Sequence, residues 1–157
     1  MKNLLQTLCG LFLVVFYSSC MNSGDNRVDV LIVGGGASGV TSGIQAARMG
    51  ANTLILEETT WLGGMLTSAG VSAVDGNYRL PAGLWGEFKN RLSDYYGGLD
   101  SLKTGWVSNV LFEPSVGNKI FHEMVSAEKN LKVWKQTRLE EVKRVGDEWI
   151  AKVNVEG

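Results

Sequence analysis

The pattern of apolar and polar positions divides the chain into an apolar leader, a short polar stretch and a mixed body. Leu4 to Tyr17 form an apolar run that only Gln6 and Thr7 interrupt, and Lys2 places a positive charge before it. A run of this length is too short to span a bilayer comfortably and is typical of a secretory signal peptide. Residues 21–27 are polar and have no apolar period, so they predict a flexible tether.

The mixed body opens with the pattern of a strand, a helix and a second strand. Residues 28–33 are apolar except for Asp29 and are largely β-branched, which predicts a strand buried on both faces of a parallel sheet. Apolar residues then recur at helical spacing and predict a helix from about Ser38 to Met49, which Gly50 ends in a left-handed conformation. Residues 53–56 predict a second buried strand.

The rest of the body predicts two further helices and then strands. One amphipathic helix ends at the glycine pair Gly97-Gly98, and another opens near Pro114. Residues 131–137, 139–145 and 149–155 read as strands, and the last two flank a Gly-Asp hairpin turn. Together these elements predict an α/β fold, a Rossmann-type domain in which a parallel sheet carries a helical insert and a β-meander.

A glycine-rich turn joins the first predicted strand to the first helix. Its sequence, Gly34-Gly35-Gly36-Ala37-Ser38-Gly39, has the form G-x-G-x-x-G. Gly34 would let the chain turn tightly, Gly36 would let a diphosphate touch the backbone, and Gly39 would let the helix lie close to the strand. The N–H groups of the first helical turn, where Ala37 and Ser38 lie, have no intrahelical acceptors and predict a diphosphate site.

The second predicted strand ends in Glu57, twenty-three residues after Gly34. This is the spacing of the acid that binds the ribose hydroxyls of a dinucleotide, and its charge would disfavour a 2′-phosphate. A solvated carboxylate at the end of a strand is the alternative interpretation. A glycine motif alone is weak evidence in a chain with 20 glycines, but strand, helix and acid coincide here within thirty residues. The segment therefore predicts a dinucleotide-binding Rossmann unit.

The body resembles the amino-terminal part of FAD-dependent oxidoreductases with the glutathione-reductase type of flavin fold. It is most similar to the bacterial branch related to the A subunit of heterodisulfide reductase. The resemblance is carried by Asp29 to Gly39, by Glu57, by Leu62-Gly63-Gly64-Met65, by Thr67 to Gly70 and by Phe112-Glu113-Pro114. It covers most of the chain after the tether.

The resemblance implies FAD as the cofactor and a flavin contact at the loop that contains Gly63 and Gly64. Without the resemblance, this glycine pair indicates only a tight turn. The implied chemistry is hydride or electron transfer through FAD, with an unknown small-molecule substrate and an unknown electron acceptor. In the family, a later strand, a second flavin motif and the substrate region follow the point at which Gly157 stands, so we expect an amino-terminal part of a longer enzyme.

Composition and charge argue against several other classes of function. Fifteen basic and sixteen acidic residues leave a net charge of −1, which gives no excess for binding a nucleic-acid backbone. The two cysteines, Cys9 and Cys20, both fall in the leader, so the body has no disulfide framework, zinc site or iron–sulfur ligand set. His122 is the single histidine, and we expect it to be an exposed helix residue. No residue is assigned a catalytic role.

The leader ends in Ser18-Ser19-Cys20, which resembles the lipobox of bacterial lipoproteins, although Tyr17 stands where an aliphatic residue is usual. The resemblance implies lipidation at Cys20, export to the bacterial cell envelope and membrane attachment through the lipid. Ordinary signal cleavage and an uncleaved short anchor are the alternatives. The predicted organisation is a signal peptide over 1–20, a tether over 21–27 and a partial FAD-binding domain over 28–157.

Two other functions stay open on the sequence alone. An NAD-binding dehydrogenase domain would use the same strand, glycine turn and helix. A non-catalytic surface lipoprotein could keep a Rossmann fold for binding or assembly. The flavin interpretation is preferred because the second glycine loop fits the family that the chain resembles.

Overall fold

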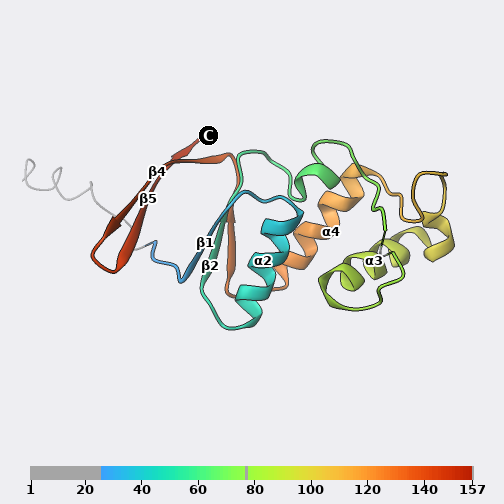
Figure 1. Ribbon diagram of the computed structural model, residues 1–157, viewed down its shortest axis with the longest axis horizontal. Coiled ribbons are helices and arrows are strands. Elements are labelled where there is room, and N and C mark those ends of the chain that lie inside the picture. Colours follow the sequence, from blue (N-terminus) through green and yellow to red (C-terminus); the bar gives the residue numbers. More distant parts are fainter. Residues whose placement is uncertain (1–25, 77, 157) are drawn as a thin grey trace, which may run out of the picture.

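The computed structural model describes residues 26–76 and 78–156, which make up the predicted body except for residues 77 and 157. The predicted signal peptide with Cys20 and most of the predicted tether lie outside the described residues. Figure 1 shows the helices gathered beside a small sheet, with a two-stranded hairpin at the opposite end of the molecule. Within the described ranges, no helix combines the length and the apolar character that crossing a membrane requires.

The main sheet has three parallel strands in the order β1-β2-β3. They are β1 (Val30–Val33), β2 (Thr53–Leu56) and β3 (Leu131–Trp134), and Ile32 of β1 lies opposite Ile55 of β2. Parallel pairing needs a crossover connection, and a helix supplies it between β1 and β2. The mixed α/β architecture with a parallel sheet that the sequence predicts is therefore confirmed.

The crossover helix is α2 (Ala37–Arg48), which matches the predicted helix to within one residue at each end. Its buried face carries Val40, Gly43, Ile44 and Ala47. A Cβ at Gly43 would lie 2.7 Å from Cδ1 of Ile55, so a glycine there lets the helix lie close to the sheet. Gly50 follows the helix with φ +96°, the left-handed conformation that the sequence predicts for its end.

The prediction that the first strand is buried on both faces is wrong. In β1, Leu31 is 36% exposed and Val33 is 57% exposed, whereas Leu56 of β2 is only 1% exposed. The difference follows from the cover of each face, because Ile32 packs against the core cluster, whereas Leu31 and Val33 point to the opposite face of β1. The side chains of β1 alternate between half-buried and exposed, which is the pattern of a strand with one covered face.

The helical insert between β2 and β3 contains α3 (Gly83–Tyr96), the 3₁₀ turn η3 (Leu99–Leu102) and α4 (Pro114–Ser126). Gly97 ends α3 with φ +78°, as the glycine pair in the sequence predicts. Pro114 opens α4 in its first turn, where its missing N–H costs no hydrogen bond.

Aromatic rings join these helices to one another in the core. The ring of Phe88 on α3 stacks on that of Phe121 on α4 with centroids 4.4 Å apart, and it meets Phe112 edge-on at 5.5 Å. All three side chains are at least nine-tenths buried. Burying one such side chain contributes about 1.5–3 kcal/mol, so this cluster is a principal source of cohesion within the insert.

The second sheet is an antiparallel hairpin of β4 (Thr137–Val145) and β5 (Glu148–Val155). Gly146 turns between them with φ +63°, which confirms the predicted hairpin turn. The segment 131–137 does not form one strand, because β3 ends at Trp134 and the chain bends at Gln136, which has φ +51°.

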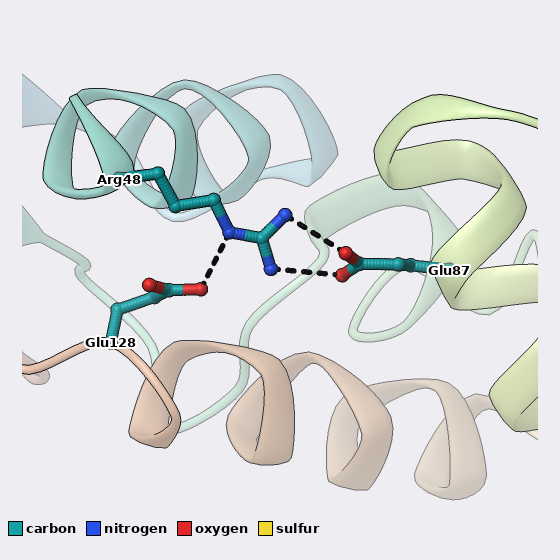
Figure 2. Close-up of polar contacts among 3 residues, drawn as sticks. All are labelled: Arg48, Glu87 and Glu128. Atoms are coloured by element: carbon teal, nitrogen blue, oxygen red, sulfur yellow. Dashed lines mark hydrogen bonds and ion pairs between the residues drawn. The ribbon is translucent and has the colours of Figure 1, made fainter.

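Arg48 joins the carboxyl end of α2 to two other elements (Figure 2). Its two terminal guanidinium nitrogens donate to both carboxylate oxygens of Glu87 on α3, at 2.9 and 3.0 Å. Its Nε donates to Glu128, just after α4, at 2.7 Å. The hydrogen bonds from Arg48 lower the pKa of Glu87, and those to Glu87 and Glu128 raise the pKa of Arg48, because they stabilise the charged carboxylate and the charged guanidinium.

Replacing this arginine should loosen the contact between the three elements. We expect Arg48→Gln to lower the free energy of unfolding by about 1 kcal/mol. This value is at the upper end of the range measured for ion pairs that are partly exposed to water. The folded-state pKa of Glu87 lies below its unfolded value, so the stabilisation is present above about pH 4.3 and is lost as pH falls through the folded-state pKa. Urea denaturation of both proteins across this pH range measures the effect.

A matched control is available on the surface. Arg138 lies 3.7 Å from Glu58 and both side chains are more than 60% exposed, so Arg138→Gln should change stability by less than about 0.5 kcal/mol. Equal effects of the two substitutions would show that Arg48 contributes no more than an ordinary surface charge.

Candidate functional site

The candidate site lies where β1 ends and α2 begins. Gly34 has φ +97°, and its N–H donates to the carbonyl of Leu56 at 2.8 Å, so the chain turns sharply as soon as it leaves the sheet. A Cβ at Gly39 would collide with the carbonyl oxygen of Gly34. Both positions therefore need glycine for the fold itself: Gly34 for its conformation and Gly39 for the close approach of helix and strand.

Gly36 differs from its neighbours in the same loop. Its φ of −62° and ψ of 175° are open to any L-amino acid, and a Cβ built on it meets nothing within 4 Å. Neither backbone conformation nor packing among the described residues therefore requires a glycine at this position. The space that a side chain would fill lies at the amino-terminal end of α2.

The first turn of α2 presents backbone donors toward the same region. The helical hydrogen bonding begins with the Val40 N–H donating to the Gly36 carbonyl at 2.9 Å. The N–H groups of Ala37, Ser38 and Gly39 precede that bond and have no intrahelical acceptor. The first turn contains no acidic residue, so the positive end of the helix dipole is not neutralised by its own side chains.

A second glycine loop lies directly against the first. The Gly63 N–H donates to the Gly35 carbonyl at 2.8 Å, and Gly36 and Gly63 form a parallel bridge. A Cβ at Gly64 would lie 3.0 Å from the Cα of Gly36. The sequence identified these two loops separately, and the fold brings them into backbone contact.

The second loop runs into the 3₁₀ turn η2 (Gly64–Leu66) and is held by α4. Asn118 accepts a hydrogen bond from the Leu62 N–H at 2.8 Å, and a Cβ at Gly63 would lie 2.7 Å from the ring of Phe121. Thr67 is 1% exposed and donates to the Leu62 carbonyl at 2.6 Å. No pattern in the sequence indicates Asn118, because its partner lies 56 residues earlier in the chain.

Glu57 holds the first loop against the end of β2. One carboxylate oxygen accepts the Gly35 N–H at 2.7 Å and the other accepts the Thr59 N–H at 2.7 Å. The residue is 9% exposed. Each oxygen has a second lone pair, so these bonds leave acceptor capacity for a ligand hydroxyl. The alternative interpretation of Glu57 as a solvated surface acid is therefore wrong. Its carboxylate binds the backbone of the loop and still has lone pairs that a ligand could use.

Gly35 is a site-forming residue that the motif treats as variable. A Cβ there would lie 2.8 Å from Leu62 and 2.9 Å from the Glu57 carboxylate. A side chain would therefore separate the first loop from both the acid and the second loop. The signal available in the sequence was the unbroken run of three glycines, Gly34 to Gly36.

The single histidine lies outside this arrangement of loops. His122 on α4 is half-buried, so the expectation of an exposed residue is wrong. Burial, and secondarily the positive charge of Lys135, lowers its pKa and favours the neutral ring at physiological pH. The described ranges contain no group of three histidine, cysteine, aspartate or glutamate residues arranged to hold a metal ion.

Comparison with protein families gives one match. A family model described as FAD dependent oxidoreductase matches residues 29–157. Among curated proteins, none matches the sequence.

Solved structures share the fold at low sequence identity. CabE, an aromatic hydroxylase from angucycline biosynthesis, is similar with a TM-score of 0.56 and 14% identity over 83% of this chain and 28% of its own. OxyS anhydrotetracycline hydroxylase from Streptomyces rimosus is similar with a TM-score of 0.54 and 14% identity over 81% of this chain and 28% of its own. The chain spans about a quarter of the length of these two proteins.

Proposed function

The chain belongs to the family of FAD-dependent oxidoreductases, and on that premise we propose that its two glycine loops bind the adenine-nucleotide end of FAD. The diphosphate would lie against the first turn of α2, and Glu57 would accept hydrogen bonds from the ribose hydroxyls. The second loop would contact the remainder of the cofactor. The residues of the proposed site are Gly34, Gly36, Ala37, Ser38, Gly39, Glu57, Gly63 and Gly64.

The observation that carries this proposal is the open space beside Gly36. A glycine that neither conformation nor packing requires is explained if a ligand needs the volume of its missing side chain. The N–H groups of the adjacent helical turn have no intrahelical acceptor and favour a ligand with negative charge, which a diphosphate has.

The residues around the site would bind and orient the cofactor. Bound FAD would supply hydride or electron transfer, and the chain would supply position and electrostatics. Oxidation of a small-molecule substrate, with transfer to a separate acceptor, is the activity we propose for the whole enzyme. The finer resemblance to the branch related to heterodisulfide reductase belongs to the same proposal.

A substitution at Gly36 should separate cofactor binding from folding. We expect Gly36→Val to weaken FAD binding by about a hundredfold, because its side chain would occupy the place of the diphosphate. The free energy of unfolding should fall by no more than about 1 kcal/mol, the loss expected from a poorer helix cap. Flavin absorbance of the purified protein and FAD titration measure binding, and thermal denaturation measures the fold.

The contrasting variant in this experiment is Gly39→Val. Its side chain would collide with the Gly34 carbonyl, so it should destabilise the fold whether or not FAD is present. Wild-type FAD affinity in Gly36→Val would contradict the proposed placement. A colourless wild-type protein that binds NADH more tightly than FAD would favour an NAD-binding domain, and one that binds neither nucleotide would favour a non-catalytic lipoprotein.

The neighbouring acids Glu57 and Glu58 allow a matched test of the ribose contact, because replacing either one by glutamine removes one negative charge. Glu57→Gln should weaken FAD binding about ten- to hundredfold, because it loses a charged hydrogen bond and turns an amide toward backbone donors. Glu58 is exposed and lies 3.7 Å from Arg138, so Glu58→Gln should change the affinity by less than about twofold. Equal losses in both variants would indicate a general effect of charge and would contradict the contact.

We also propose that the protein is exported and attached to the bacterial cell envelope by a lipid on Cys20. Support comes from the apolar leader and the Ser-Ser-Cys sequence that ends it. Because the leader has no twin arginine, the chain would cross the membrane unfolded and acquire FAD afterwards.

This proposal predicts a difference between the two cysteines of the leader. Cys20→Ala should abolish incorporation of labelled fatty acid and release the protein from the membrane fraction, since the anchor is lost. Cys9→Ala, a matched change within the same apolar leader, should leave both unchanged. Membrane attachment that survives Cys20→Ala would favour an uncleaved anchor instead.

A further inference from the structure

The helical insert contains a pocket of about 370 Å³ that the nucleotide site does not use. Its walls come from the loop before α3, from α3 itself and from the segment around η3. The residues that line it are Tyr78, Arg79, Lys89, Leu99, Leu102, Lys103, Asn109 and Val110.

A buried cation forms part of the floor of this pocket. Lys89 is 7% exposed, and its ammonium donates to the carbonyls of Tyr78 and Leu80 at 2.7 and 2.9 Å. An ammonium group has three donors, and the structure gives this one two oxygen acceptors among the described residues. The ring of Trp85 lies 5.8 Å from Nζ and adds a weak cation–π contact. These carbonyl and aromatic contacts are all uncharged. Because a buried charge is costly without a partner of opposite charge, the ammonium of Lys89 favours an anion nearby.

The rim of the pocket adds further positive charge. Arg79 and Lys103 are exposed at its mouth, and no carboxylate is among the residues that line it. Asp100, which bonds Lys103 at 2.8 Å, is 96% exposed and lies outside the lining. An incoming anion could therefore replace this acid at Lys103 with little cost.

The remaining wall is apolar and firmly held. Leu102 is fully buried and Val110 is 3% exposed, and the backbone N–H of Leu111 donates to the Leu102 carbonyl at 3.0 Å. Ser108 donates to the carbonyl of Val74 at 2.7 Å, which ties the two segments of the wall together. A ligand that fills this pocket thus needs an apolar portion as well as a negative charge.

The pocket is distinct from the proposed nucleotide site. Glu87 of α3 meets Arg48 at the carboxyl end of α2, while the glycine loops lie at the amino end. A helix of 12 residues separates these ends by about 18 Å. Lys89 follows Glu87 by two residues and so faces away from that contact. No residue of either glycine loop lines the pocket.

We propose that this basic pocket binds a small organic carboxylate with an apolar body. The carboxylate would pair with Lys89 and with the cations of the rim, and the apolar body would lie on the exposed side chain of Leu99, since Leu102 and Val110 have almost no exposed surface. This binding does not depend on the flavin, so its test is independent of the proposed nucleotide site.

Isothermal titration of the full chain with hexanoate, 1-hexanol and inorganic phosphate tests the proposal. Hexanoate should bind saturably and more tightly than either other probe, because it alone combines the charge with the apolar body. Arg79→Gln and Lys103→Gln should each weaken hexanoate binding about five- to tenfold, and added salt should weaken it further. Both side chains are exposed, so circular dichroism should show an unchanged fold.

The matched control is Lys129→Gln, which removes one charge at an exposed turn outside the pocket and should leave the affinity unchanged. Methyl resonances of Leu99 should shift on addition of hexanoate. The proposal is overturned if no saturable binding occurs, if all three variants bind alike, or if phosphate binds as tightly as hexanoate.

Discussion

The close approach of α2 to the end of β1 is the constraint on which the rest of the site depends. It is possible only because Gly39 lacks the Cβ that would collide with the Gly34 carbonyl. That approach places the first helical turn, whose N–H groups have no intrahelical acceptor, at the carboxyl edge of the sheet. The same bend brings the Gly35 N–H to the Glu57 carboxylate, so the turn and the acid are positioned by one interaction.

Residues remote in sequence complete the site and fix both ends of the helix that forms it. At the amino end, α4 holds the second glycine loop through Asn118 and Phe121, and that loop bonds to the first. At the carboxyl end, Arg48 bonds to an acid on α3 and to another after α4. The helical insert therefore does more than fill space, because it sets the distance between the two glycine loops. A fold held in this way can present backbone donors to an anion without a cationic side chain in the loop.

The sequence alone determined the features that depend on residues close to one another in the chain. The period of apolar residues located α2 and the ends of its neighbouring strands, since 3.6-residue and two-residue spacings follow from backbone geometry. Gly50, Gly97 and Gly146 marked ends and turns because each position needs a left-handed conformation that glycine adopts without strain. The G-x-G-x-x-G motif and the acid at Glu57 located the candidate site for the same local reason.

Only the tertiary structure decided which distant residues meet. It placed Asn118 on the second loop, gave the Glu57 oxygens two backbone donors, and left Val33 of β1 exposed where the local pattern predicts burial. It also brought Arg79 from a loop, Lys89 from α3 and Lys103, the residue after η3, to one pocket. Spacing along a chain fixes which face of one element a residue occupies, whereas its partners depend on how the elements pack, and that is a property of the whole fold.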